Sequence, residues 1–496
     1  MRFVFISAVE FGYKCLETFI GKKVNIVGIF TLDEKKAKNI SGFISFDKLA
    51  EKYNIPIFKI KDVNSLDVIE KIKKLKPDYI SVIGWSQMIS KELLSIPKKG
   101  CINIHPTLLP KNRGRAPIPW TLIKNLKKSG VTLYYLDEDT DSGDVIAQKE
   151  FTIDLNDDAK SVYKKALSAS TKLLKDIIPH LINGTAPRKA QNQMDATYWP
   201  KRSPDDGIID WDKTTMEIYN WIRGLTHPYP GAFTFLNDKK MFVWKASLCE
   251  KQYLGSPGEI VDIIEDGIIV KTSDGCILLN KVQLNGEEET TANKIIEKHN
   301  IRKGIILNKK KYGINKKETI RKEIRSIRSM QSKFEKIYKN KNIRYKLFSM
   351  EEFKKAKTIS IYISRKNEVD TKEIIKKAFE MNKMICVPSM KNKPCMCLIT
   401  EKYNIHEHTP LLVDKNTKKV KPEDLDIIIV PGIAFDEKGR RIGSGKGYYD
   451  TFLSELKGKK PIIALAFDFQ IVDEIPSEPH DVHMDKIVTE KRIINC

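Results

Sequence analysis

The sequence predicts an α/β protein in which two α/β domains flank a smaller β-rich region. Short apolar strands alternate with amphipathic helices at the start of the chain, at residues 2–7, 13–19, 24–30, 68–75 and 79–84. This alternation is typical of a mostly parallel sheet covered by helices. A second alternating pattern of strands and helices lies near the C-terminus. Between the two patterns, the sequence changes to short apolar runs separated by turns.

The middle of the chain, residues 207–307, carries short apolar runs separated by Gly and Asp turns, at 241–244, 258–264, 267–271 and 276–279. Such spacing favours a small antiparallel barrel. A helix is predicted over 318–334, and strands and one helix follow at 358–363, 372–381, 384–388, 425–431 and 461–468. We therefore expect domains at 1–204, 205–308 and 317–496, with a basic linker at 309–316.

Length and composition agree with this organisation. The chain has 496 residues, of which 41% are hydrophobic, so it has room for about three domains and is not disordered overall. No apolar run reaches the roughly 18 residues that a membrane span needs, and the N-terminus does not read as a signal peptide. The eight cysteines contain no CxxC pair, which favours reduced thiols and a cytoplasmic location.

The net charge of +23 is distributed unevenly. Residues 1–204 carry +12, residues 205–308 carry −4, residues 309–346 carry +12 and residues 347–496 carry +3. More than half of the excess therefore lies in one Lys-rich stretch of 38 residues. A solvated connection and helix would explain it, and so would phosphate binding by some of its cations. Few aromatic residues are interleaved, so a platform for stacking bases is weakly supported.

A first candidate site follows the strand that ends near residue 105. Asn103 and His105 are two residues apart, so on a strand they share one face. The prolines that follow end the strand and place His105 at its carboxyl end, where open α/β sheets bind their ligands. Asp141 lies in an acidic turn after the next apolar run. A carboxylate beside an imidazole would orient the ring and raise its pKa.

These residues resemble the formyltransferases that use 10-formyltetrahydrofolate as donor. The resemblance rests on HPTLLPKNRGRAPIPW (105–120), DSGDVIAQ (141–148), RSPDDGIIDW (202–211) and HPYPGAFTF (227–235). It implies a Rossmann-like catalytic domain followed by an OB-like barrel. It also implies that His105 is the general base for an amine and that Asn103 donates to the oxyanion. Asp141 would hold the useful tautomer of His105 and stabilise its charged form.

The same resemblance implies the binding residues of this half. Folate would contact Gly84, Trp85, Gln87, Leu108, Leu109 and Pro110, and the acceptor would contact Arg113 and Arg115. The family includes enzymes that formylate nucleotide-linked amino sugars and enzymes that formylate initiator methionyl-tRNA. The strings GWSQ (84–87) and KNRGRAP (111–117) resemble the sugar enzymes, the basic insertion of the tRNA enzymes is missing from residues 33–58, and the barrel is acidic. We favour a nucleotide amino sugar, with tRNA as the alternative.

A second candidate site is the glycine-rich run GRRIGSGKGYYD (439–450). Its glycines surround a lysine, so its backbone N–H groups can close on phosphate. The spacing is not that of a Walker A loop. The longer run 431–453 resembles 5-formyltetrahydrofolate cyclo-ligase, and the resemblance extends to KETIRKEIRSIR (317–328), NEVDT (367–371) and the C-terminal stretch 464–490.

This second resemblance implies an α/β domain of the cyclo-ligase type that uses ATP and Mg²⁺. Mg²⁺ prefers carboxylate and phosphate oxygens and would bind Asp450 and Asp481. The pterin of 5-formyltetrahydrofolate would contact Glu368 and Tyr449. ATP would contact Lys317, Arg321, Arg441, Gly443, Gly445, Lys446, Gly447 and Tyr448. The implied reaction phosphorylates the formyl oxygen and closes the methenyl bridge, a task of positioning and charge neutralisation.

The sequence therefore predicts a bifunctional enzyme of one-carbon folate metabolism. Its N-terminal half would consume 10-formyltetrahydrofolate, and its C-terminal half would convert 5-formyltetrahydrofolate to 5,10-methenyltetrahydrofolate. A nucleic-acid-binding protein built on inactive folate-like halves is the alternative of another class. Small-molecule folates and a nucleotide amino sugar are the expected partners, no membrane is involved, and a homodimer is compatible with these features.

Overall fold

The computed structural model describes residues 1–34, 42–308, 316–389, 395–400, 418–445, 449, 453, 460–477 and 481–496. The chain divides into two compact units, Met1–Ile314 and Asn315–Cys496. The predicted basic linker lies outside the described residues except for Lys316. The two units are described separately.

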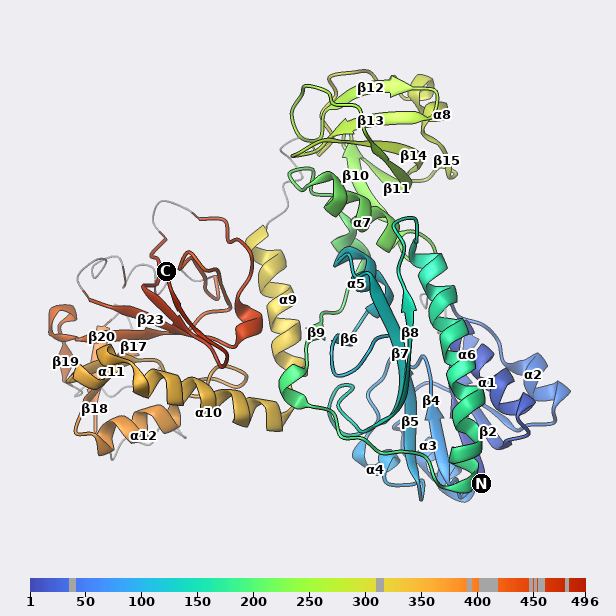
Figure 1. The fold of residues 1–496 in the computed structure, drawn as a ribbon, viewed down its shortest axis with the longest axis horizontal. Coiled ribbons are helices and arrows are strands. Elements are labelled where there is room, and N and C mark those ends of the chain that lie inside the picture. The colour runs from blue at the N-terminus through green and yellow to red at the C-terminus, as the bar shows by residue number, and fades with distance from the viewer. Residues whose placement is uncertain are drawn as a thin grey trace. The chain divides into compact units, whose positions relative to one another are not determined.

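The first unit contains a seven-stranded sheet with the order β3-β2-β1-β4-β5-β7-β8 (Figure 1). Its strands are β1 (Arg2–Ile6), β2 (Asn25–Leu32), β3 (Ile57–Ile60), β4 (Tyr79–Val82), β5 (Gly100–His105), β7 (Lys128–Tyr135) and β8 (Val145–Thr152). The first five are parallel, whereas β7 runs antiparallel to β5 and β8 runs antiparallel to β7. The predicted mostly parallel sheet is confirmed.

Helices cover both faces of this sheet. They are α1 (Glu10–Gly21), α2 (Asp47–Lys52), α3 (Leu66–Lys74), α4 (Lys91–Leu94), α5 (Pro117–Ile123) and α6 (Ala159–Asn183). Phe3 and Phe5 of β1 point to the face covered by α1, α2 and α6, and Val4 and Ile6 point to the face covered by α3 and α4. Since side chains alternate along a strand, an uninterrupted apolar run fits a sheet that is buried on both sides.

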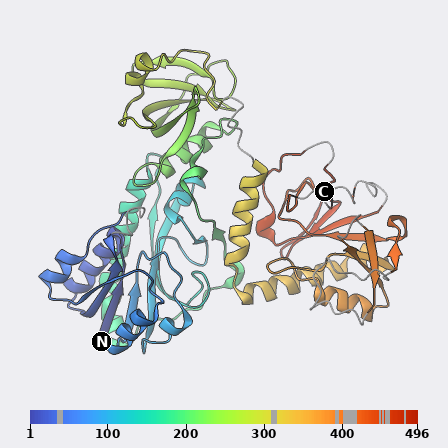
Figure 2. The ribbon, with the colours of Figure 1, turned by 180° about the vertical axis from the view of Figure 1, so that it is seen from behind.

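The β-rich region forms an antiparallel sheet with the order β10-β11-β14-β13-β12, with β15 paired to β14. Its elements are α7 (Thr215–Leu225), β10 (Ala232–Leu236), β11 (Lys239–Cys249), β12 (Ile260–Ile264), β13 (Gly267–Lys271), β14 (Cys276–Leu284), β15 (Thr290–Thr291) and α8 (Ala292–Lys298). Asn237 and Asp238 both have positive φ, as a two-residue hairpin between β10 and β11 requires. The strands curl around one apolar core, as Figure 2 shows.

The second unit contains an eight-stranded sheet with the order β19-β18-β17-β16-β20-β23-β24-β25. Its strands are β16 (Thr358–Ile361), β17 (Met384–Ser389), β18 (Cys395–Ile399), β19 (Lys419–Val420), β20 (Ile427–Val430), β23 (Ile462–Leu465), β24 (Lys486–Val488) and β25 (Ile493–Asn495). The five central strands, from β17 to β24, are parallel. This confirms a second α/β domain.

The helices of this unit are α9 (Lys316–Met330), α10 (Lys333–Ser349), α11 (Glu351–Lys355) and α12 (Lys372–Glu380). The single helix predicted over 318–334 is interrupted, because the Ser332 side chain caps a new helix and Glu335 completes the capping box. A two-stranded ribbon of β21 (Ala434–Phe435) and β22 (Arg441–Ile442) leads into the glycine loop.

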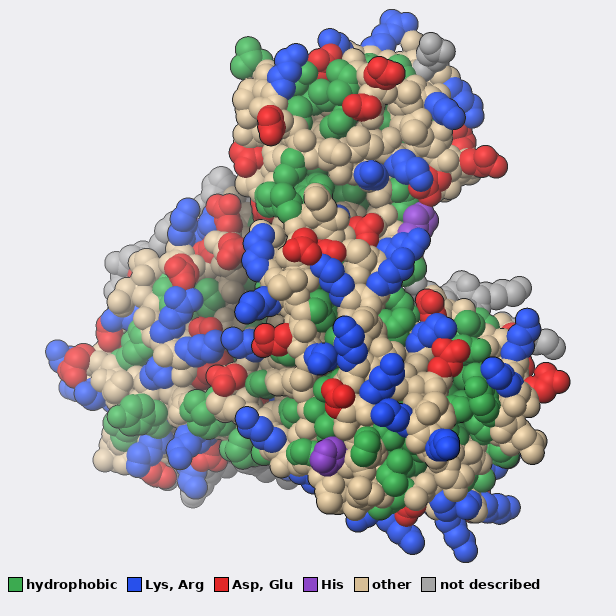
Figure 3. Space-filling view, turned by 45° about the vertical axis from the view of Figure 1, so that its right-hand side comes forward, with side chains coloured by type: hydrophobic (Ala, Val, Ile, Leu, Met, Phe, Trp, Pro, Cys, Tyr) green, Lys and Arg blue, Asp and Glu red, His purple; other side chains and the backbone are tan. Residues whose placement is uncertain are grey.

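The surface and the helices bear on two partners considered from the sequence, a nucleic acid and a membrane. On the face shown in Figure 3, Lys and Arg side chains are interspersed with Asp and Glu. This face therefore lacks the continuous basic field that is typical of nucleic-acid-binding proteins. Among the described helices, none has the length and apolar character needed to cross a membrane.

Candidate active sites

The structure brings Asn103, His105 and Asp141 together. Asn103 and His105 lie on one face at the carboxyl end of β5, and Asp141 lies in the turn after β7 with a positive φ of 51°. The His105 Nδ1 atom is 3.6 Å from Asp141 Oδ2. The backbone N–H of Gly114 donates to the same carboxylate oxygen at 2.8 Å. The imidazole and the carboxylate are therefore held side by side in a mostly buried setting.

The two nitrogens of His105 have different partners. Nε2 lies 3.0 Å from the backbone carbonyl oxygen of Asn112. Because a carbonyl oxygen can only accept a hydrogen bond, Nε2 carries a proton in this geometry. Nδ1, which faces Asp141, is then the nitrogen without a proton in the neutral ring. In this geometry the Asn112 carbonyl holds the proton on Nε2, and Asp141, which was predicted both to hold the tautomer and to stabilise the charged imidazole, faces Nδ1.

One residue of this cluster was missed from the sequence. Tyr134 on β7 is fully buried, and its hydroxyl donates to Asp141 Oδ1 at 2.5 Å. The same hydroxyl accepts a hydrogen bond from Asn103 Nδ2 at 3.0 Å. Burial raises the pKa of Tyr134 well above its ordinary value, and the charge of Asp141 raises it further.

The two arginines predicted to contact the acceptor occupy different environments. Arg113 is fully buried on the short strand β6 (Arg113–Gly114), which pairs with β9 (Tyr198–Trp199). Its guanidinium donates to Gln191 Oε1 at 2.6 Å and to the Tyr198 hydroxyl at 3.0 Å. This burial conflicts with the predicted contact between Arg113 and an acceptor. Arg115 is exposed and is compatible with that role.

We predict that Arg113→Ala destabilises the first unit by about 3 kcal/mol or more, since hydrogen bonds to a charged group contribute roughly 1.5–3 kcal/mol each. All six tryptophans lie in residues 1–308, so tryptophan fluorescence during urea unfolding reports on this unit. Arg115→Ala is the matched control and should change the free energy of unfolding by less than about 0.5 kcal/mol. Equal effects of the two substitutions would contradict the structural role of Arg113.

The residues predicted to bind folate in this half lie in two segments beside the cluster. Gly84 has a φ of +69°, and a Cβ there would lie 2.4 Å from a Val9 methyl group, so the turn after β4 requires glycine. The Trp85 Nε1 atom is buried and has no hydrogen-bond partner within the described part of the chain. An unsatisfied buried donor fits a ligand that brings an acceptor.

The other predicted folate contacts differ in how far they are already engaged by other parts of the protein. Gln87 accepts from Val63 N–H at 3.0 Å and donates to the Lys61 carbonyl at 3.3 Å, so both ends of its amide anchor a loop. Leu109 is buried, and its backbone N–H donates to Thr132. Leu108 and Pro110 are half-buried and retain surface for a ligand.

In the second unit, the predicted phosphate-binding residues meet at the start of α9. Lys317 Nζ is 3.0 Å from Asp481 Oδ2, and Arg321 Nε donates to the Gly443 carbonyl at 2.9 Å. Arg321 is therefore next to the glycine loop, where Gly445 has a positive φ of 98°, and Lys317 lies one helical turn before it on α9. Lys446, Gly447, Tyr448 and Asp450 lie outside the described residues.

The residues predicted to hold the pterin in this unit are also close to cations. The Arg441 guanidinium lies 5.5 Å from the centre of the Tyr449 ring. Arg441 is buried and donates to the Pro431 carbonyl. Burial lowers the pKa of Arg328, a residue that sequence reasoning missed, and the charge of Glu368 opposes this shift. Glu368, Tyr449 and the two arginines therefore form one partly buried polar region.

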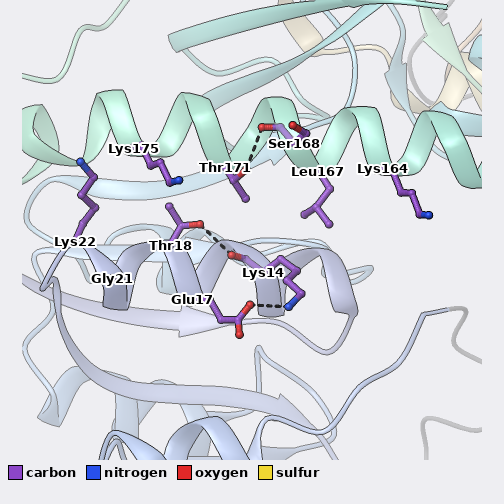
Figure 4. A pocket seen from close by; sticks show the side chains of 10 residues that line it. All are labelled: Lys14, Glu17, Thr18, Gly21, Lys22, Lys164, Leu167, Ser168, Thr171 and Lys175. Atoms are coloured by element: carbon purple, nitrogen blue, oxygen red, sulfur yellow. Dashed lines mark hydrogen bonds and ion pairs between the residues drawn. The ribbon is translucent and has the colours of Figure 1, made fainter.

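A separate groove lies between α1 and α6, away from these residues (Figure 4). Its volume is about 590 Å³, and four lysines line it: Lys14, Lys22, Lys164 and Lys175. Lys14 is paired with Glu17 at 2.8 Å. None of the predicted site residues lines the groove, so it is a feature of the helix layer and not of the reaction sites.

Comparison with known families finds a family match for each half of the chain. Residues 2–178 match the formyl transferase family, residues 201–300 match the formyl transferase C-terminal domain, and residues 313–490 match the 5-formyltetrahydrofolate cyclo-ligase family. A methionyl-tRNA formyltransferase of Clostridioides difficile (strain 630) is 35% identical over 310 residues, which are 62% of this chain and all of the relative.

Two solved structures represent the two halves. An N-formyltransferase from Helicobacter canadensis, in complex with folinic acid and dTDP-3-aminofucose, is 21% identical with a TM-score of 0.45, and the match covers 56% of this chain and 98% of that one. A 5,10-methenyltetrahydrofolate synthetase from Aquifex aeolicus is 30% identical with a TM-score of 0.33, covering 36% and 92%. From the matches in sequence, the chain belongs to the formyltransferase family through its N-terminal part, carries a 5-formyltetrahydrofolate cyclo-ligase domain after it, and is an enzyme of folate one-carbon chemistry.

Proposed function

We propose that residues 1–204, completed by the barrel at 205–308, transfer the formyl group of 10-formyltetrahydrofolate to a primary amine. In the same proposal, residues 317–496 convert 5-formyltetrahydrofolate to 5,10-methenyltetrahydrofolate with ATP. The observation that carries the first half is the 3.6 Å approach of His105 Nδ1 to Asp141 beside the Asn103 amide. An inactive folate-like scaffold that binds nucleic acid has no need of this arrangement.

The chemistry of formyl transfer follows from the partners of these side chains. The amine attacks the formyl carbon and loses a proton, which His105 accepts at Nδ1 while Nε2 stays bound to the Asn112 carbonyl. The resulting imidazolium is stabilised by Asp141. One hydrogen of Asn103 Nδ2 is bound to Tyr134, and the other remains to donate to the oxyanion that develops on the formyl oxygen. The bond between the formyl carbon and N10 then breaks, and the proton passes to N10 as tetrahydrofolate leaves.

The acceptor that we favour is the amine of a nucleotide-linked amino sugar. Arg115 is exposed beside the catalytic cluster, and a guanidinium suits a diphosphate because it can donate two parallel hydrogen bonds. The barrel carries a net charge of −4, which is the wrong sign for gripping the phosphates of a tRNA. The solved relative from Helicobacter canadensis was crystallised with a sugar nucleotide of this kind.

Initiator methionyl-tRNA is the second candidate, because relatives of 32–35% identity across both the catalytic domain and the barrel bear the name methionyl-tRNA formyltransferase. An acceptor screen with 10-formyltetrahydrofolate separates the two. We expect formylation of a nucleotide amino sugar, and only weak tRNA binding that falls steeply with salt. Tight, salt-resistant binding of initiator tRNA together with its formylation would reverse this choice. The His105→Ala chain is the control for background transfer.

The cyclo-ligase half is supported by two contacts of α9: Arg321 donates to Gly443 of the glycine loop, and Lys317, one turn earlier, pairs with Asp481. Both cations would neutralise ATP phosphates. Of the two predicted Mg²⁺ ligands only Asp481 is described, and the described residues form no cluster of three or more candidate ligands. Mg²⁺ is usually held by one or two carboxylates together with substrate phosphates. The ion would supply charge neutralisation at the phosphates.

A further inference from the structure

Tyr134 connects the two parts of the catalytic cluster. It lies on β7 directly opposite Asn103 of β5 in the antiparallel register. Its hydroxyl contacts Asn103 Nδ2 at 3.0 Å and Asp141 Oδ1 at 2.5 Å, and its side chain is fully buried. Both partners of this one phenol therefore belong to the predicted catalytic set, whereas a tyrosine that only fills a core has no reason to contact either.

The direction of each hydrogen bond is fixed by chemistry. An ionised carboxylate can only accept, so the single proton of the phenol is donated to Asp141. The lone pairs of the phenol oxygen are then available to the Asn103 amide, which donates. Burial and the nearby charge of Asp141 raise the pKa of Tyr134 well above its ordinary value, so the hydroxyl stays protonated.

These bonds leave one defined donor for a substrate. Asn103 Oδ1 accepts from the Ile104 N–H at 2.7 Å, and one Nδ2 hydrogen is bound to Tyr134. The amide can therefore not flip, and its second Nδ2 hydrogen is the remaining donor. On the other side, Asp141 has one oxygen bound to Tyr134, while its second oxygen faces Gly114 N–H and the His105 ring.

We propose that Tyr134 is a positioning residue for formyl transfer, whose hydroxyl locks the Asn103 amide and the Asp141 carboxylate in one arrangement. The proposal rests on the proposed formyl transfer and deepens it. Tyr134 touches no reacting atom in this scheme. It acts by keeping the oxyanion donor and the partner of the imidazolium at a fixed separation before the substrates bind, which lowers the cost of reorganisation during the reaction.

Tyr134→Phe in the full chain removes the hydroxyl and keeps the ring. We expect kcat for formyl transfer to fall about 10- to 100-fold, with KM for 10-formyltetrahydrofolate changed less than about 2-fold. In the Asp141→Asn background, Tyr134→Phe should lower kcat by less than about a further 3-fold. The effects of two residues that act as a unit are not additive. An unchanged kcat, or fully multiplicative losses, would overturn the proposal.

The control is Tyr135→Phe, which removes a neighbouring phenol on the opposite face of the same strand and should leave kcat within about 2-fold. The cyclo-ligase rate of each variant, measured on the same chain, reports whether the protein remains folded.

A second measurement does not depend on the acceptor. The side-chain amide of Asn103 is followed by NMR in ¹⁵N-Asn-labelled full chain without substrate. Tyr134→Phe should shift one Nδ2 proton resonance and speed its exchange, and Tyr135→Phe should do neither. Unchanged Asn103 signals would reject the link. If the signals change as expected and the wild type formylates no amine, the proposed function fails and the hydrogen-bond link stands.

Discussion

Replacing His105 with alanine is expected to abolish formyl transfer, with a loss of at least about 10³-fold, while the ATP-dependent cyclo-ligase reaction of the same chain should continue. In the proposed mechanism His105 accepts the proton of the amine at Nδ1, because Nε2 is bound to the Asn112 carbonyl. General-base catalysis alone contributes roughly 10²–10⁴-fold. The measurement is the release of tetrahydrofolate from 10-formyltetrahydrofolate in the presence of the acceptor.

His180→Ala is the matched control for this prediction. His180 is exposed near the end of α6, and its Nδ1 atom contacts only the Thr185 hydroxyl among the interactions described for its ring. Its substitution should leave both reactions within about 2-fold. Loss of both activities in His105→Ala would contradict two independent sites, and retained formyl transfer would reject His105 as the base.

Arg321→Ala is expected to lower kcat/KM for ATP in the cyclo-ligase reaction by about 10²- to 10³-fold. The guanidinium lies beside the glycine loop and holds the Gly443 carbonyl, so its removal takes away a cation and an anchor together. Charge-assisted contacts to phosphate are among the strongest hydrogen bonds in proteins, and phosphoryl transfer depends on them. The rate of methenyltetrahydrofolate formation is measured against ATP concentration.

Arg325→Ala provides the comparison, because Arg325 lies one turn further along α9 and is exposed. It should change kcat/KM for ATP by less than about 2-fold. Formyl transfer should be unaffected in both variants. Equal losses in Arg321→Ala and Arg325→Ala would assign the effect to the charge of the helix rather than to a contact at the loop.

Much of the fold was readable from the sequence because each strand of a doubly covered sheet is an unbroken apolar run. The predicted strand over residues 2–7 matches β1 (Arg2–Ile6) in the covered sheet, and the spacing of Asn103 and His105 correctly placed both on one face of β5. The break between α9 and α10 was missed, because Ser332 and Glu335 lie inside a stretch whose helical pattern continues on either side.

What the sequence did not reveal depends on contacts between distant segments. Tyr134 enters the cluster only through the register of β5 against β7, and no local pattern specifies that register. The burial of Arg113 depends on Gln191 and Tyr198, about 80 residues further along the chain. A basic residue in a glycine-containing loop therefore resembles a ligand contact in the sequence, although its partners make it part of the interior.

The pairing of β6 with β9 has a consequence for the proton chemistry. The segment that contains buried Arg113 also supplies the Asn112 carbonyl that fixes Nε2 of His105 and the Gly114 N–H that fixes Asp141. The groups that face the two ring nitrogens of His105 are therefore held in place by the main chain, and the pairing of β6 with β9 positions that main chain. Substitutions at Gln191 or Tyr198, which meet neither reactant, should therefore alter how readily His105 exchanges a proton.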